Sequence, residues 1–595
     1  MNKYNSRSEV PEKYKWDLRD FYKDEKDFEE NLNIFKNAIT KSKEYVGCTK
    51  DSEKLYEFLN YLFNTYCLGE NLEVYAFLKN DEELGNSDSI NRVNKIDNLF
   101  EKFVSSISFF EPELLELDKK DYNKLFKNEK LLDYKFYLDE IYKSKDHILS
   151  EKEEIIINEL FSAMDHFSDI SSNLLNNEHD YGKIKIDNEE EEIHSTNYSR
   201  LIKNKDVNIR REVFQKYKNV LNQYGGTSAS LLDSYVKANN ANARIHKFKD
   251  AWDKKLFDYD MPNEAYDALV KVVSNNLDIL HKYISLYKDT LNLNEVHMYD
   301  LNLDLVNQDK KYSIEDAISL VREAIKPLGE EYLKCYDKII DNHYIDFCEY
   351  KGKCSGGYSA STMDHDSRIL LSFNDDLSSV STIAHECGHN VHHQFVKKNN
   401  KLHYRDITNL VAEVVSLTNE CLLSSYLADN GTTKEEKLSG ICNILDVIEN
   451  NLFGAVREGL IERDFNNYSC EGNAITKDYM NELDGKYIKE YYGKDVIYDE
   501  NYNTTWIRRS HYYMNYYLFN YAFCISVASS IASKILLNDK ETLNNYLKFM
   551  SLGSNIYPID AFKVLGIDLT KEQVYEDAIK YFDSLIEKFK KISKE

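Results

Sequence analysis

Apolar residues recur mainly at intervals of three and four, which is the spacing of one face of an α-helix. The pattern is clear in Asp51–Phe77 and Glu151–Asn176, and it returns in long stretches from about residue 200 to about residue 340. It resumes at Ser379 and continues nearly to Glu595. Only five Pro and 20 Gly interrupt the chain. The pattern therefore predicts a mainly α protein, a large helical body.

Two segments depart from this pattern. Lys and Ile alternate in Lys183–Ile186 just before the acidic run Glu189–Glu192, which predicts a small hairpin. The change of texture near residues 180–200 suggests a boundary, so we expect an N-terminal helical domain over 1–195 and a second domain over 196–595. Further on, Tyr344–Tyr350 and Arg368–Phe373 are predicted strands on either side of a glycine-containing loop. We expect them to form a small antiparallel sheet beside the helix that follows.

Charge and cysteine usage narrow the class of protein. The 595 residues include 102 acidic and 76 basic ones, a net charge of −26, which argues against nucleic acid and against a polybasic membrane surface. The chain starts without an apolar run, and its most apolar window, Tyr521–Ala532, looks too short to span a membrane. Ten Cys without a CxxC pair favour reduced thiols and a cytoplasmic location. Both a monomer and a homo-oligomer fit.

The segment Ser378–Phe395 contains His385, Glu386 and His389 in the pattern HExxH. Its apolar residues follow a helical spacing, and both imidazoles fall on the opposite side of the helix. Two His one turn apart can share a tetrahedral Zn²⁺ at about 2.0–2.1 Å each. Glu386, next to the first His, is placed to take a proton from water without binding the metal. A charged helix face with incidental His is the simpler alternative.

A catalytic zinc needs a third protein ligand and an open fourth position. The third-His pattern of metzincins would require His at position 395, which is Phe395. Glu413 is a better candidate, since it lies among apolar residues on the next predicted helix, Asp406 to about Asp429. Glu420, two turns on, could orient a ligand His through its second ring nitrogen, although an ordinary surface carboxylate is almost as plausible.

Two further segments suggest how a substrate could bind. Gly356 and Gly357 precede Tyr358 in the loop before the metal helix, and a strand edge there could hold an extended peptide. The segment Trp506–Phe523 offers neutral hydrogen-bond donors for a developing oxyanion, namely His511 and tyrosines. Tyr513, Tyr517 and Tyr521 recur every four residues. A plain turn and core packing are the simpler interpretations of these two segments, because the chain contains 46 Tyr.

Taken together, HECGH, LVAEVVSLTNE, KCSGGYS, HYYMNYYLFNYA and the opening VPEKYKWDLRDFY resemble oligoendopeptidase F, a member of the thimet oligopeptidase-like zinc peptidases. The resemblance covers essentially the whole chain. It implies a helical body with a deep substrate channel, a catalytic zinc metallopeptidase domain over 196–595, and cleavage of internal bonds in short peptides. It implies one zinc held by His385, His389 and Glu413, with Glu386 as general base and Glu420 behind the metal ligands.

The resemblance assigns the transition-state and substrate donors to His511 and the tyrosines that follow it. Tyr517 and Tyr521 fit the oligoendopeptidase F pattern, while more distant relatives suggest Tyr516 and Asn520 instead. Two other functions stay open at this point. One is an end-trimming carboxypeptidase on a similar body, and the other is a catalytically inert helical peptide-binding protein.

Overall fold

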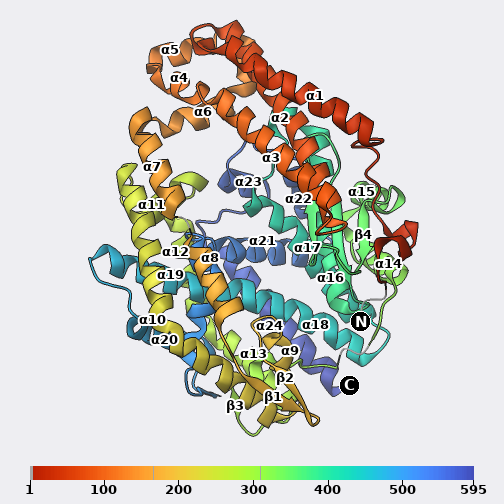
Figure 1. The fold of residues 1–595 in the computed structure, drawn as a ribbon. Helices are drawn as coiled ribbons and strands as arrows, with labels where there is room; N and C mark the ends of the chain where they lie inside the picture. Colours follow the sequence, from red (N-terminus) through yellow and green to blue (C-terminus); the bar gives the residue numbers. More distant parts are fainter. Residues whose placement is uncertain (1–3, 165, 308–309) are drawn as a thin grey trace. The chain divides into compact units, whose positions relative to one another are not determined.

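The computed structural model describes residues 4–164, 166–307 and 310–595. Helices dominate, which confirms the predicted mainly α class (Figure 1). The chain divides into two compact units built from interleaved segments. Unit 1 comprises residues 1–148, 309–426 and 531–566, and unit 2 comprises 149–308, 427–530 and 567–595. Each unit contains segments from before and after residue 195. The predicted boundary between domains 1–195 and 196–595 therefore stays a prediction about the order of segments along the sequence.

Unit 1 begins with helices that pack around an aromatic core. Phe28, Phe35 and Phe58 are fully buried there, and α1, α2 and α3 lie side by side in red to orange in Figure 1. Each begins at an Asp or Asn whose side chain accepts backbone N–H groups of the first turn. The helices of this part are α1 (Glu25–Lys41), α2 (Ser52–Asp81), α3 (Ser87–Ile107), α4 (Phe110–Glu116), α5 (Lys119–Leu125) and α6 (Lys135–Lys143).

The second part of unit 1 contains a sheet and the two helices of the HExxH region. Its elements are α14 (Ile314–Ala324), α15 (Glu330–Asp341), β4 (Ile345–Cys348), β5 (Tyr358–Ala360), β6 (Arg368–Phe373), α16 (Leu377–Asn399) and α17 (Asn409–Asn430), with α22 (Lys540–Met550) and α23 (Pro558–Val564) from the C-terminal region. The helix predicted from Asp406 begins three residues later, at Asn409.

The sheet beside α16 is mixed, so the predicted antiparallel sheet is wrong in part. The strand order is β4-β6-β5, with β4 parallel to β6 and β5 antiparallel to β6. The loop between the two predicted strands contains a strand of its own, β5, which pairs on the other side of β6. As a result β4 and β6 run in the same direction, and β5 is an edge strand.

Unit 2 is also helical. Its elements are α7 (Glu151–Met164), α8 (Phe167–Asn173), β1 (Lys183–Ile186), β2 (Glu189–Glu192), α9 (Tyr198–Leu201), α10 (Val207–Ile245), α11 (Ala251–Tyr259), α12 (Asn263–Asn275), α13 (Leu277–Thr290), β3 (Val296–His297), α18 (Lys434–Ile448), α19 (Ala455–Cys470), α20 (Lys477–Tyr492), β7 (Val496–Ile497) and α24 (Gln573–Lys594). The predicted hairpin is present, because β1 pairs with β2 and Asp187 and Asn188 turn the chain with φ of 51° and 71°.

Helix α21 (Phe519–Leu536) contains the most apolar window of the sequence and is longer than the window Tyr521–Ala532. By length and composition it is sufficient to cross a membrane, and it is the one such helix in the described part of the chain. However, 78% of it is buried within the protein, as in the core helix of a globular domain. The apolar stretch is therefore longer than the sequence pattern suggested, but its side chains pack against the rest of the chain.

Candidate active site

Helix α16 presents His385 and His389 on its less buried face. The Asp376 side chain accepts the backbone N–H of Ser379 at 2.8 Å and starts the helix. Val380, Ile383 and Val391 are fully buried on the opposite face and fix the rotation of the helix. The two imidazoles are consequently half-buried, with exposed side-chain fractions of 24% and 20%.

Helix α17 crosses α16 at Gly388, and this crossing brings Glu413 and Glu420 to the histidines. A Cβ at Gly388 would lie 2.9 Å from the Cα of Ser416, so only glycine permits this approach. Asn419 fastens the crossing by donating to the Ala384 carbonyl at 2.9 Å and accepting from the Tyr332 hydroxyl at 2.8 Å. Sequence reasoning missed Gly388 and Asn419, although the glycine inside HECGH was a visible signal.

His385, His389 and Glu413 form a group of potential metal ligands. Their ligand atoms all lie within 4.8 Å of one another. The two His Nε2 atoms are 3.2 Å apart, and Glu413 carboxylate oxygens lie 3.5 Å from His385 Nε2 and 3.8 Å from His389 Nε2. A tetrahedral zinc with ligands at about 2.1 Å separates its ligand atoms by roughly 3.4 Å. The donor types and their separations therefore fit one zinc ion.

Glu420 supports the first of these ligands from behind. Its Oε1 lies 2.7 Å from His385 Nδ1, and its Oε2 accepts a hydrogen bond from Ser381 Oγ at 3.0 Å. Burial lowers the pKa of His385, but the hydrogen bond and charge of Glu420, with Glu413 and Glu386 nearby, outweigh burial and raise this pKa to about 9. The carboxylate at Nδ1 favours a proton on that nitrogen and leaves Nε2 of His385, the nitrogen that would bind a metal, facing His389 and Glu413.

Glu386 is buried, with 7% of its surface exposed. Burial raises the pKa of its carboxyl to about 7, while His385 nearby lowers it. A carboxyl that titrates near neutrality can both accept and release a proton. Glu386 also lines the same cavity as His385, His389 and Glu413, which encloses about 500 Å³.

The edge strand β5 forms another wall of that cavity. Gly357, Tyr358 and Ser359 line it, and β5 has a strand partner only on its β6 side within the described residues. Gly356 adopts a φ of +100°, and a Cβ at Gly357 would lie 2.8 Å from Thr382 Cγ2 on α16. The backbone conformation thus favours glycine at position 356, and the close contact with Thr382 favours glycine at position 357. The Tyr358 hydroxyl donates to Asp81 at 2.7 Å, so its ring is anchored to α2.

A buried ion pair that sequence reasoning missed holds this loop in place. Lys353 Nζ lies 2.7 Å from Asp346 Oδ1, and both side chains are 1% exposed. The same ammonium donates to the carbonyls of Cys348 at 2.9 Å and Leu371 at 2.7 Å. These contacts tie the loop between β4 and β5 to strands β4 and β6. Breaking such a pair costs about 3–5 kcal/mol.

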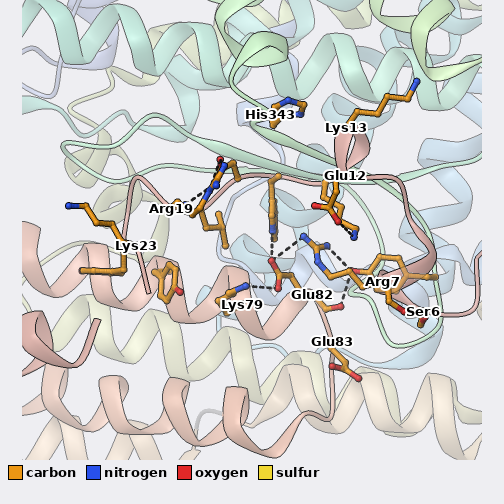
Figure 2. A pocket seen from close by; sticks show the side chains of 18 of the residues that line it. Ser6, Arg7, Glu12, Lys13, Arg19, Lys23, Lys79, Glu82, Glu83 and His343 are labelled. Carbon is orange, nitrogen blue, oxygen red and sulfur yellow. Dashed lines mark hydrogen bonds and ion pairs between the residues drawn. The ribbon is translucent and has the colours of Figure 1, made fainter. Parts of the chain in front are cut away.

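Another cavity in unit 1, of about 970 Å³, is lined by the N-terminal segment and the end of α2 (Figure 2). It contains none of the residues predicted for the site. Figure 2 shows Arg7 and Lys79 paired with Glu82. Arg19 pairs with Asp17, so many charges of this cavity satisfy one another. Arg7 also pairs with Asp346. These contacts fasten the N-terminal segment to the sheet, which is a structural role.

The predicted donors of unit 2 form a cluster of their own. His511 Nε2 lies 3.3 Å from the Tyr521 hydroxyl, and the rings of Tyr517 and Tyr521 are 5.4 Å apart. The continuous helical stripe implied by Tyr513, Tyr517 and Tyr521 is wrong. Asn515 and Tyr516 have φ of 45° and 57°, and α21 begins only at Phe519, so Tyr513 packs against Tyr235 instead.

Comparison with known proteins places this site in a family. The family model "Peptidase family M3" matches residues 200–581, and "Oligopeptidase F" matches residues 113–181. The chain belongs to peptidase family M3. It is 30% identical to "Oligopeptidase PepF" of Bacillus subtilis over 99% of this chain and 89% of that protein. It is 29% identical to an "Oligoendopeptidase F homolog" of Lactococcus lactis, over 99% and 98% of the two chains.

Solved structures agree with this assignment to family M3. The oligoendopeptidase F structure from Enterococcus faecium has a TM-score of 0.73 and 27% identity, and covers 95% of this chain and 98% of its own. A structure from Chlamydophila abortus has a TM-score of 0.92 at 27% identity, over 99% and 100% of the two chains. The predicted resemblance to oligoendopeptidase F is confirmed, and the chain is a peptidase.

Proposed function

We propose that this chain is a zinc-dependent oligoendopeptidase that hydrolyses internal bonds of short peptides. The observation that carries the proposal is the arrangement of His385, His389 and Glu413, whose separations of 3.2, 3.5 and 3.8 Å fit the ligand atoms of one tetrahedral zinc ion. Membership of family M3 supports peptides as substrates.

The surrounding residues supply the proton chemistry. Zinc, when bound, would supply a Lewis acid that polarises a carbonyl oxygen and makes water more acidic. The carboxylate of Glu386 would take a proton from water in the cavity and pass it to the amine that leaves. Glu420 would hold His385 in its ligating tautomer through the 2.7 Å contact at Nδ1.

We further propose that His511, Tyr517 and Tyr521 donate hydrogen bonds to the oxyanion and to the substrate. Their support is their mutual contact within unit 2, where His511 Nε2 lies 3.3 Å from the Tyr521 hydroxyl and the centroids of the three rings lie 5.4–6.3 Å apart. Burial and the charge of Arg509 lower the pKa of His511. Its imidazole is then neutral at pH 7 and needs no counterion to act as a donor.

The substrate would bind as an extended strand along β5. The free edge of β5 lines the cavity beside Glu386, and an added peptide strand would pair with its main chain at Gly357 and Tyr358. Pairing of this kind recognises the main chain of the peptide rather than its side chains. This mode suits an enzyme that acts on short peptides of varied sequence. Ten cysteines without a CxxC pair are the basis on which we propose a cytoplasmic location.

The test combines metal analysis with product mapping. We expect about one equivalent of zinc per chain by elemental analysis, and cleavage of an internally quenched peptide that stops with a chelator and returns with zinc. Mass spectrometry should find cuts at internal bonds. Full activity of metal-free protein would overturn the proposal, and release of single terminal residues would indicate an end-trimming enzyme instead.

A further inference from the structure

Unit 2 contains a cavity of about 350 Å³ that none of the residues of the proposed reaction lines. Among its lining residues are some from α10, α19 and the 3₁₀ segment Tyr502–Arg508, and α10 contacts each of the other two elements. Figure 1 shows α10 and α19 side by side. Four cationic side chains line it: Lys203, and one from each of these three elements, Lys218, Arg457 and Arg508.

Lys218 is a buried ammonium with no carboxylate of the described residues at ion-pair distance. Only 6% of its surface is exposed, and Nζ donates to Thr505 Oγ at 2.7 Å and more weakly to the Tyr502 carbonyl at 3.5 Å. Burial, with Arg508 and Arg457 nearby, lowers the pKa of Lys218 to about 7, against the opposing charge of Asp484. The positive charge of Lys218 is therefore poorly compensated by the chain itself.

Arg457 brings a second incompletely paired cation to the cavity. It is 6% exposed and pairs through Nη2 with Glu458 at 3.0 Å, but its buried Nε–H has no acceptor among the described residues. A buried N–H group of a charged side chain is destabilising when its hydrogen bond is not made. Arg508 stands over the rings of Tyr198 and Tyr217 at 5.4 and 5.6 Å, an arrangement that leaves the edge of its guanidinium to bond elsewhere.

The carboxylates of the same cavity are engaged by other donors. Asp304 pairs with Lys203 at 2.7 Å, Asp446 accepts from the Tyr283 hydroxyl, and Glu449 accepts from the Tyr492 hydroxyl at 3.4 Å. Burial raises the pKa of Glu449 to about 7, although the charge of Arg457 nearby lowers it. Asp304 and Asp446 are thus engaged by groups other than Lys218 and Arg508.

We propose that this cavity binds a compact oxyanion, a phosphate group, between Lys218, Arg457 and Arg508. Lys and Arg side chains are the usual partners of phosphate oxygens, and the buried Nε–H of Arg457 would gain its acceptor. The cavity is larger than a phosphate ion, and aromatic rings such as Tyr198 and Tyr492 line the rest of it. It therefore has room for the organic part of a phosphomonoester.

The test is isothermal titration of the full-length, zinc-loaded protein at constant ionic strength with inorganic phosphate, phenyl phosphate and chloride. We expect one saturable site for phosphate in wild type. Lys218→Met and Arg508→Gln should each weaken binding at least about tenfold, because each removes a charge-assisted hydrogen bond. Lys216→Met, an exposed lysine on the same helix outside the cavity, is the matched control and should bind as wild type.

Each outcome decides the proposal. Tighter binding of phenyl phosphate than of inorganic phosphate would identify a phosphorylated small molecule as the ligand class, and equal binding would identify free phosphate. No saturable binding, or equal responses to phosphate and chloride, would overturn the site. Phosphate bound at a metal would be insensitive to both substitutions, and that result would also overturn it. If Lys218→Met fails to fold, the exposed Arg508→Gln variant decides alone.

Discussion

At the scale of single residues, the proposed chemistry depends on Glu386. Replacing it by Gln keeps the shape of the side chain but removes the base, so we expect turnover to fall by about 10²–10⁴-fold. Zinc content should stay at one equivalent, because the three ligands are unchanged. Steady-state cleavage of a quenched peptide and elemental analysis measure the two effects. The exposed Glu435→Gln is the matched control, and unchanged turnover of Glu386→Gln would refute the role of Glu386 as base.

In the proposed function, Glu420 acts through His385 rather than on the substrate. Glu420→Gln should lower zinc affinity by about 10–100-fold, since the negative partner of Nδ1 is lost. Ser381→Ala removes only the second hydrogen bond to Glu420 and should lower affinity less. Competition with a zinc indicator measures both. Equal affinities in wild type and Glu420→Gln would contradict the positioning role.

Residue types and their spacing made much of this site predictable. His385, Glu386 and His389 lie within five residues, and a helix of known pitch places the two His on one face. Glu413 was predicted from its apolar sequence neighbours, and Glu420 from its position two turns further along the same helix. Both side chains contact His385. The ion pair of Lys353 and Asp346 was not predictable, because the sequence does not show which opposite charge the fold will bring next to each of them.

At the scale of elements, the close crossing of α16 and α17 positions every candidate metal ligand. Gly388→Ala would push a Cβ to 2.9 Å from the Ser416 Cα, which is backbone and cannot rotate away. We expect a loss of about 1–3 kcal/mol in the free energy of unfolding, with weaker zinc binding. Urea unfolding measures the stability.

Gly226→Ala is the matched control for this crossing. Gly226 lies within α10, and a Cβ there would meet nothing within 4 Å. We expect a gain of about 0.4–1 kcal/mol from the less flexible unfolded chain. Similar changes in the two variants would show that the crossing of α16 and α17 tolerates a side chain at position 388.

Element types were more predictable than their pairing and bounds. Periodicity identified the helices and the β1–β2 hairpin, since both depend on local sequence. The direction of β4 against β6 depends on where β5 pairs, which is a long-range choice that no local pattern encodes. The regular spacing of Tyr513, Tyr517 and Tyr521 suggested one helix, but left-handed backbone at Asn515 and Tyr516 ends that register before α21 begins.

At the scale of the whole molecule, metal binding should be visible as stability of the folded chain. His385, His389 and Glu413 come from two helices, α16 and α17, and meet only when these helices are packed. Zinc should therefore bind the folded state far better than the unfolded one. By mass action, free zinc at 100 times its Kd adds about 2.7 kcal/mol, and at 1,000 times about 4.1 kcal/mol.

Thermal unfolding of the full chain checks this, with the metal stripped by a chelator and then restored in a zinc buffer. We expect the midpoint of the transition to rise with free zinc in wild type and in Glu386→Gln alike, because Glu386 is not a ligand in the proposal. In Glu413→Ala the rise should be much smaller. If Glu413→Ala responds to zinc like wild type, another residue must complete the site. If Glu386→Gln alone loses the response, the assignment of base and ligand must be exchanged.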